Sequence, residues 1–316
     1  MIISASRRTD IPAFFTEWFM NRIRKGYCSF PNPMNAHNVV RVDLTPEQVD
    51  VIVFWTKNPA PLIPHLEELD ALGYRYYFHY TLNGYGLDIE PRVPPLHEGI
   101  TTFKRLADKV GPRKVIWRYD PIIFTERTSP NYHLDRFGEI ADQLNRHTSR
   151  VVISIVDEYR AAVSRLKRLA QALDYHTRSC KPGTDEFANL FTTMSGIAQR
   201  NNMEIFSCAE ELDLDAYGIR HGKCIDNAYI TAVFGHEIRV GKDKSQRMAC
   251  GCIASRDIGM YDTCLHDCAY CYATRIKDTK QRVEQHDPQS PSLIGLHDAE
   301  PKQEQTSAQL SMFEEK

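Results

Sequence analysis

The sequence has no long apolar run. No stretch approaches the roughly 18 consecutive apolar residues that a membrane-spanning helix requires. The amino end, MIISASRR, also lacks the extended apolar core of a secretory signal. We therefore expect a cytoplasmic protein without a membrane partner.

Excess charge and phosphate-binding glycine motifs are absent as well. The 316 residues carry a net charge of −2, so no overall basic field would attract nucleic acid. No G-x-G-x-x-G motif follows an apolar run, which argues against a dinucleotide-binding domain, and no glycine-rich phosphate loop is present. Hydrophobic residues make up 42% of the chain, enough for a large core.

Short apolar runs alternate with amphipathic stretches through the first two thirds of the chain. The runs predict strands at 2–5, 51–55, 74–80, 114–119, 151–156 and 203–206. The stretches between and after them predict helices at 12–25, 61–72, 96–110, 134–146, 159–173 and 185–200. Six strand-then-helix units in series indicate an α/β fold with parallel strands, either an open doubly wound sheet or a partial barrel.

Polar residues follow each predicted strand, at the edge of a parallel sheet where chemistry usually collects. Each of them alone is equally well explained as a capping or turn residue. Together they would line one mouth, and we interpret them as candidate substrate-binding residues. They are Arg7, Arg8, Asp10, Asp120, Asp157 and Glu210.

The cysteines are concentrated near the end of the chain. Five of the nine lie between 250 and 271, and Cys264, Cys268 and Cys271 form the pattern C-x3-C-x2-C in TCLHDCAYCYA. Three such thiolates would hold three irons of a [4Fe–4S] cluster and leave the fourth iron open. The alternative is a zinc site completed by His266, Cys252 or Cys250, in a binding or adaptor protein on a β/α scaffold.

With Tyr270 before its last cysteine, this motif resembles the signature of the radical S-adenosylmethionine (SAM) superfamily. The resemblance implies an enzyme in which the open iron binds SAM and the reduced cluster cleaves it to start radical chemistry. It also implies a reductant such as flavodoxin or ferredoxin. The superfamily usually carries its cysteines after the first strand, whereas here they follow the sixth, a permuted-looking arrangement.

The chain also resembles a bacterial domain-of-unknown-function family, number 1848. The resemblance rests on SASRRTDIPAF (4–14), FWTKNP (54–59), RYDP (118–121) and the cysteine-rich segment 246–273. The two resemblances together imply a (βα)6 partial TIM-like barrel over 1–220. They also imply a cluster-binding segment over 221–276 that closes the mouth. We expect an irregular or disordered tail over 277–316, because its composition turns polar.

The superfamily resemblance also suggests residues that would hold SAM. The segment after the second strand usually meets the SAM amino group. Here that segment contains Lys57 but no glycine, so Asn83 and Gly84 after the third strand are candidates to replace it. Arg118 would pair with the SAM carboxylate, because a guanidinium matches a carboxylate in shape and charge. Tyr270 would lie near the cluster and the adenine.

The remaining cysteines leave two alternatives. Cys208, Cys224, Cys250 and Cys252 would ligate a second, auxiliary iron–sulfur cluster, or they are buried thiols. We expect Cys28 and Cys180 to be structural.

One further motif lies in the tail. The sequence QLSMF at 309–313 resembles the peptide by which bacterial DNA-polymerase and repair proteins bind the sliding clamp. The resemblance implies a clamp partner and a nucleic-acid-related substrate. The alternative is a tail that folds back on its own domain.

Overall fold

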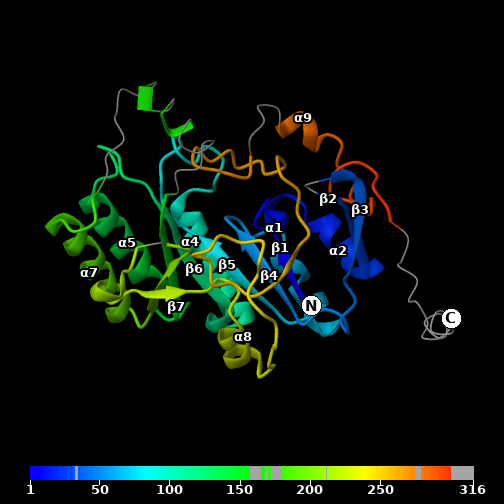
Figure 1. Cartoon of the computed structure of the whole chain (residues 1–316), viewed down its shortest axis with the longest axis horizontal. Coiled ribbons are helices and arrows are strands. Elements are labelled where there is room, and N and C mark those ends of the chain that lie inside the picture. Colours follow the sequence, from blue (N-terminus) through cyan, green and yellow to red (C-terminus); the bar gives the residue numbers. More distant parts are fainter. Residues whose placement is uncertain are drawn as a thin grey trace, which may run out of the picture.

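A large parallel sheet forms the centre of the computed structural model (Figure 1). The structure describes residues 1–32, 35–156, 165–167, 170–171, 180–210, 212–274 and 279–299. Among them, eight strands pair in the order β10-β1-β4-β5-β6-β7-β8-β9, and every pairing is parallel. The strands are β1 (Ile2–Ala5), β4 (Val51–Thr56), β5 (Tyr76–Thr81), β6 (Val115–Ile122), β7 (Arg150–Ile155), β8 (Glu204–Cys208), β9 (Arg220–Gly222) and β10 (Arg256–Asp257).

The six predicted strands are confirmed as β1, β4, β5, β6, β7 and β8. Their near-continuous apolar sequences suit strands that are covered on both faces. In β5, for example, all residues from Tyr76 to Tyr80 are buried. The short edge strands β9 and β10 contain few apolar residues, which is why no apolar run in the sequence indicated them.

The helices between the strands are α1 (Ile11–Phe14), α2 (Thr16–Lys25), α3 (Leu66–Ala71), α4 (Leu96–Val110), α5 (Pro130–Leu144) and α7 (Asp185–Arg200). Two predicted helices, 96–110 and 185–200, are confirmed at their exact bounds. The predicted helix 12–25 is divided at Phe15 into α1 and α2. Helix α5 begins four residues before its predicted start, because Ser129 caps it and Pro130 occupies its first position.

The predicted helix 61–72 begins instead as a 3-10 turn, Ile63–His65, before α3. Most of the predicted helix 159–173 lies outside the described residues. A further 3-10 turn precedes β6 (Pro112–Lys114) and another precedes β9 (Asp215–Tyr217). Two helices were not predicted, namely α8 (Asn227–Phe234) and α9 (Thr279–Val283).

From β1 to β9 the sheet order follows the chain order, so each crossover proceeds in the same direction. Right-handed crossovers in one direction place their helices on one face of the sheet. Residues of α2, α3, α4, α5 and α7 accordingly pack with one set of strand side chains. The opposite set packs with Ile230 of α8 and with residues 224–253. In Figure 1 the yellow and orange chain after α8 crosses the sheet. Within the described residues no pairing joins β9 to β10, so the sheet is open.

A hairpin and the start of the tail pack beside α2 (Figure 1). The hairpin pairs β2 (Tyr27–Asn32) with β3 (Asn35–Asp43) in antiparallel fashion. Trp18 of α2 donates from Nε1 to the carbonyl of Ser290 over 3.0 Å, and Ser29 N donates to the carbonyl of Pro291 over 2.9 Å. Residues 279–299 are therefore largely irregular in secondary structure but packed against the domain.

Candidate functional site

Two groups of cysteines lie at the carboxyl edge of the sheet. The first is the loop group, Cys264, Cys268 and Cys271. The second is the four-cysteine group, Cys208, Cys224, Cys250 and Cys252. Residues that follow β1, β4 and β5 contact the loop that carries the first group, whereas side chains on one sheet face contact the second.

Asp10 fixes the loop group to the end of β1. Its Oδ1 caps α1 by accepting from Ala13 N over 3.0 Å. Its Oδ2 lies 2.8 Å from Nε2 of His266 and 2.7 Å from the backbone N of Lys57. His266 is bonded through its second ring nitrogen as well, because Nδ1 lies 3.2 Å from the carbonyl of Arg92. Both nitrogens of His266 are thus occupied, and Asp10 positions structure instead of facing a substrate.

Glu90 joins the segments after β4 and β5 to the cysteine loop. Its Oε1 accepts from Nζ of Lys57 over 2.7 Å, from Nδ2 of Asn83 over 3.2 Å, and from the hydroxyl of Tyr270. Asn83 Nδ2 also lies 3.2 Å from the Tyr270 hydroxyl. Burial alone would lower the pKa of Lys57, but the negative charges of Glu90 and Cys268 outweigh it and raise that pKa. The sequence-predicted residues Lys57, Asn83 and Tyr270 therefore do converge.

The three loop thiols lie near one another, with Cys268 buried and Cys264 and Cys271 partly buried. Burial raises the pKa of Cys264 to about 12, and the nearby Cys271 charge acts in the same direction. Burial also raises the pKa of Cys268, partly offset by Lys57. Such thiols stay protonated near neutral pH unless a metal ion displaces the protons. Three soft sulfur donors match the ligand chemistry of iron–sulfur clusters and of zinc.

The second group brings together four thiols from three segments: the end of β8, the link between β9 and α8, and the C-x-C turn. Cys208 Sγ lies 2.8 Å from Cys224 Sγ. Cys224 is also within hydrogen-bonding reach of Cys252, and Cys252 of Cys250. The shared hydrogen bonds lower the pKa of Cys208 and of Cys252, and they raise the pKa of the two neighbours that act as donors.

Two buried guanidinium groups flank these four thiols. Arg118 donates from Nη1 to Cys224 Sγ over 2.9 Å, and its Nε donates to Asp120 over 2.8 Å. Burial alone would lower the pKa of Arg7, but the charges of Cys252, Asp257 and Cys224 raise it. Arg7 Nη2 is buried without a hydrogen-bond partner among the described residues. Both guanidinium groups lie over the ring of Trp55, at 5.1 and 5.2 Å from its centroid.

Other predicted site residues bond to the protein itself. Arg118, expected to pair with SAM, instead bonds Asp120 and Cys224, and Asp120 also accepts from Ser154. Arg8 donates to the carbonyl of Gly259 over 3.2 Å, and Glu210 accepts from the backbone N of Ile155 over 2.7 Å.

Gly84 has a φ of +70°, which glycine adopts easily, and its carbonyl accepts from Tyr132. These two observations assign Gly84 to a turn. Asp157 and the 309–313 peptide lie outside the described residues.

Sequence reasoning missed Glu90, Trp55 and His79 as parts of the site. Glu90 follows β5 at a distance in the chain where no motif marks it. Trp55 and His79 read as core aromatics, yet their rings stack at 4.3 Å beside the two arginines. Burial and the Arg118 charge lower the pKa of His79 well below its usual value, so its ring is neutral there. The available signal was a large aromatic or polar side chain near the carboxyl end of each of two neighbouring strands, β4 and β5.

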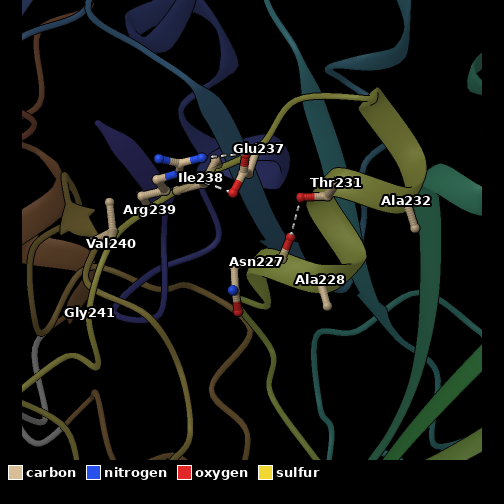
Figure 2. Close-up of a pocket in the computed structure, with 9 residues that line it drawn as sticks. All are labelled: Asn227, Ala228, Thr231, Ala232, Glu237, Ile238, Arg239, Val240 and Gly241. Carbon is tan, nitrogen blue, oxygen red and sulfur yellow. Dashed lines mark hydrogen bonds and ion pairs between the residues drawn. The ribbon is translucent and has the colours of Figure 1, made fainter.

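Two further observations concern metal sites and a pocket in the described part of the chain. No three His, Cys, Asp or Glu side chains in the described part of the chain are grouped so that they could hold a metal ion in this arrangement. The pocket in Figure 2 lies between α8 and residues 237–241 and contains none of the predicted site residues. His236 bonds Asp50, just before β4, and Arg113, before β6, bonds Ala232. This pocket therefore lies toward the amino edge of the sheet, and its lining residue Ile238 packs in the same buried cluster as Cys250 and Cys252.

The described helices include none long and apolar enough to cross a membrane. No curated protein matches the chain closely enough for comparison. Residues 2–273, which contain both cysteine groups, match the family model described as "Domain of unknown function (DUF1848)". The match spans most of the chain, and the protein therefore belongs to this family.

Proposed function

We propose that this protein is a radical SAM enzyme whose [4Fe–4S] cluster is held by Cys264, Cys268 and Cys271. The observation that carries the proposal is the number of available ligands. The loop supplies three thiols at the carboxyl edge of a parallel sheet, and each candidate for a fourth protein ligand is engaged elsewhere. Three-cysteine ligation with one open iron is what SAM binding requires.

The competing zinc site needs a fourth ligand. His266 is hydrogen-bonded at both ring nitrogens, to Asp10 and to the carbonyl of Arg92. Cys250 and Cys252 contact each other, and Cys252 also contacts Cys224. A structural zinc ion is almost always four-coordinate, so three thiols without a fourth ligand among the described residues favour the cluster.

When bound and reduced, such a cluster supplies the electron that cleaves SAM into methionine and a 5′-deoxyadenosyl radical. The chain's own residues would hold the reactants in place. Tyr270 is fixed by Glu90 and Asn83, so the loop has a set position relative to β5. Lys57 places a positive charge near Cys268 and would partly offset the charge of the thiolates.

The Lys57–Glu90 ion pair is the best candidate for the amino-acid end of SAM. The pair is buried, with side-chain exposures of 14% and 3%, and its charged atoms are 2.7 Å apart. An ammonium and a carboxylate together match the carboxylate and amino groups of an amino acid. In this proposal Lys57 and Asn83 keep their expected places near SAM, whereas Arg118 belongs to the second cysteine group.

We also propose an architecture, a compartment and an electron donor that suit this chemistry. A single-direction series of crossovers with helices on one face is how a (βα)6 partial barrel is built, and we assign the sheet to that architecture. All nine cysteines are described and none forms a disulfide, which suits a reducing cytoplasm and an electron donor such as flavodoxin or ferredoxin. Clamp binding through 309–313 remains a prediction from the sequence alone.

Electron paramagnetic resonance (EPR) tests the open iron. Protein reconstituted with iron and sulfide without oxygen, then reduced, should give a cluster signal that changes when SAM is added. The triple variant Cys264→Ala/Cys268→Ala/Cys271→Ala should lose that signal, whereas Cys28→Ala, at a buried cysteine on β2, should keep it. A cluster signal insensitive to SAM, or one that survives in the triple variant, would overturn the proposal.

A further inference from the structure

The four-cysteine group has the composition of a complete metal site. Its members come from three separated segments, and they converge within one cluster of buried residues on the sheet face opposite α2, α4 and α5. Cys224, Cys250 and Cys252 are buried, and Cys208 is partly buried against the same cluster. Four thiols among apolar side chains contribute little packing that alanine or valine would not supply. Their convergence therefore calls for another explanation.

The groups around these sulfurs are hydrogen-bond donors. Arg118 Nη1 donates to Cys224 Sγ over 2.9 Å, and the backbone N of Ile225 donates to Cys252 Sγ over 3.4 Å. Arg7 Nη2 has no partner among the described residues, although the guanidinium lies near Cys252 and Cys224. Donors of this kind stabilise thiolates and are typical of the surroundings of thiolate-bound metals.

Two cations lie beside the proposed ligands. Four thiolates and one divalent ion would carry a net charge of −2, and the guanidinium groups of Arg7 and Arg118 lie in the same buried region, each also facing a carboxylate, Asp257 and Asp120 respectively. A buried charge is tolerated when it is paired and hydrogen-bonded. Thiolates around the ion would be charged partners for both guanidinium groups, including Nη2 of Arg7, which has no hydrogen-bond partner among the described residues.

The spacing of the sulfurs favours a single ion over a cluster. A tetrahedral zinc ion with bonds of about 2.3 Å sets its sulfurs about 3.8 Å apart. In a [4Fe–4S] cluster each cysteine binds a different iron, so the sulfurs stand much farther apart. Here neighbouring sulfurs of the group are within hydrogen-bonding distance of each other. Cys208 Sγ and Cys224 Sγ, for example, are 2.8 Å apart. Zinc binding requires these sulfurs to move apart only slightly. Binding of a cluster would require the three segments to move away from one another.

We infer that Cys208, Cys224, Cys250 and Cys252 bind one divalent metal ion of the zinc class as four thiolates. The ion replaces one proton on each thiol and forms four metal–sulfur bonds, with no change of oxidation state. All four positions are protein ligands, so the site is closed and structural. It ties the end of β8, the start of α8 and the C-x-C turn to the sheet face. This differs from the auxiliary iron–sulfur cluster that the sequence suggested.

Metal analysis tests this inference independently of SAM chemistry. The full-length triple variant lacking Cys264, Cys268 and Cys271, purified aerobically, should retain one zinc per chain. Adding Cys252→Ser should remove that zinc. Adding Cys28→Ser instead should not, because Cys28 lies on β2 in the other core cluster. Co²⁺ loaded in place of zinc should show the visible bands of tetrahedral sulfur ligation in the triple variant.

A second variant separates loss of the ligand from loss of the fold. Cys250→His keeps a zinc ligand, so this protein should still bind one zinc while its Co²⁺ spectrum shifts toward mixed sulfur and nitrogen ligation. Iron with acid-labile sulfide in the triple variant, lost on Cys252→Ser, would overturn the single-ion inference. A metal-free folded protein, or one with Cys208 joined to Cys224 by a disulfide in a thiol count, would also overturn it.

Discussion

Arg118 donates a hydrogen bond from Nη1 to the sulfur of Cys224 over 2.9 Å, at the carboxyl edge of the sheet. An ordinary ion pair brings a guanidinium to a carboxylate, and Arg118 makes that contact too, with Asp120. The bond to sulfur is the less common one, and it connects a strand of the scaffold directly to the four-cysteine group. Because of this contact we assign Arg118 to the proposed four-cysteine site, and not to SAM as the sequence suggested.

Arg118→Gln should weaken metal retention at the four-cysteine site. The substitution removes the charged donor to Cys224, and residues that support metal ligands typically contribute 10- to 100-fold to affinity. Competition with a chelator, followed by a zinc-sensitive dye, measures the change. Arg239→Gln is the matched control, since that side chain is exposed and pairs only with nearby Glu237. Equal chelator sensitivity of the Arg118 variant and the wild type would refute the supporting role.

The Lys57–Glu90 pair should contribute strongly to stability as well as to the site. Lys57→Met leaves the buried Glu90 carboxylate without its cation, which should reduce the free energy of unfolding by about 3 kcal/mol. Lys57→Met/Glu90→Gln should be less destabilised than the sum of the two single variants, because the unpaired charge is gone. Urea unfolding of the four proteins measures this coupling. Strict additivity would show that the pair does not interact.

The strands of the sheet could be predicted well from the sequence, because burial of both sheet faces requires apolar residues at nearly every strand position. Strands such as β4 and β5 are covered by helices on one side and by residues 224–253 on the other, so nearly every position is apolar. Helix α4 is bounded by Pro95 and Gly111, and α7 by Thr184, which are standard end signals. The hairpin β2–β3 was missed because Pro31 and polar residues interrupt its pattern.

The site was predictable only where its residues are close in the sequence. The spacing of Cys264, Cys268 and Cys271 marks a metal-binding loop without any knowledge of the fold. Glu90 carries no such mark, because its role depends on three partners brought together by the sheet edge. The grouping of Cys208 with Cys252, which the sequence offered as one of two alternatives, depends on the chain returning across the sheet face.

His133 should make stability depend on pH. It is fully buried on α5, lies 2.8 Å from the Tyr119 hydroxyl and 3.0 Å from the Ile123 carbonyl, and burial lowers its pKa to about 4. The unfolded chain takes up this proton near pH 6.5, whereas the folded chain does so only near pH 4. The contribution is therefore complete above pH 6.5, decreases as pH falls, and is lost near pH 4.

Unfolding in urea at pH 7 and pH 5 checks this prediction. The wild type should lose about 2 kcal/mol more than His133→Gln between the two values, because glutamine does not titrate. The readout is the difference in pH dependence between the two proteins, and not the overall destabilisation that His133→Gln causes. Identical pH dependence in both proteins would contradict the assignment of His133 as a buried neutral group.

The packed start of the tail should contribute to stability through Leu293. This side chain is 1% exposed, whereas Leu296, three residues later, is 81% exposed. Leu293→Ala should lower the free energy of unfolding by about 2–4 kcal/mol, and Leu296→Ala by less than about 0.5 kcal/mol. Thermal and urea unfolding of the two variants measure the difference. Equal stability of the two would mean that residues 279–299 do not pack on the domain in solution.

SAM cleavage is the most direct test of the central claim. Protein purified without oxygen is reconstituted with iron and sulfide, reduced with dithionite, mixed with SAM and assayed for 5′-deoxyadenosine. We expect 5′-deoxyadenosine from the wild type and from Cys28→Ala. We expect none from Cys264→Ala/Cys268→Ala/Cys271→Ala, which should also hold about four fewer irons per chain. A wild-type protein that holds zinc at these cysteines, or that holds iron and leaves SAM intact, would show that it is not a radical SAM enzyme.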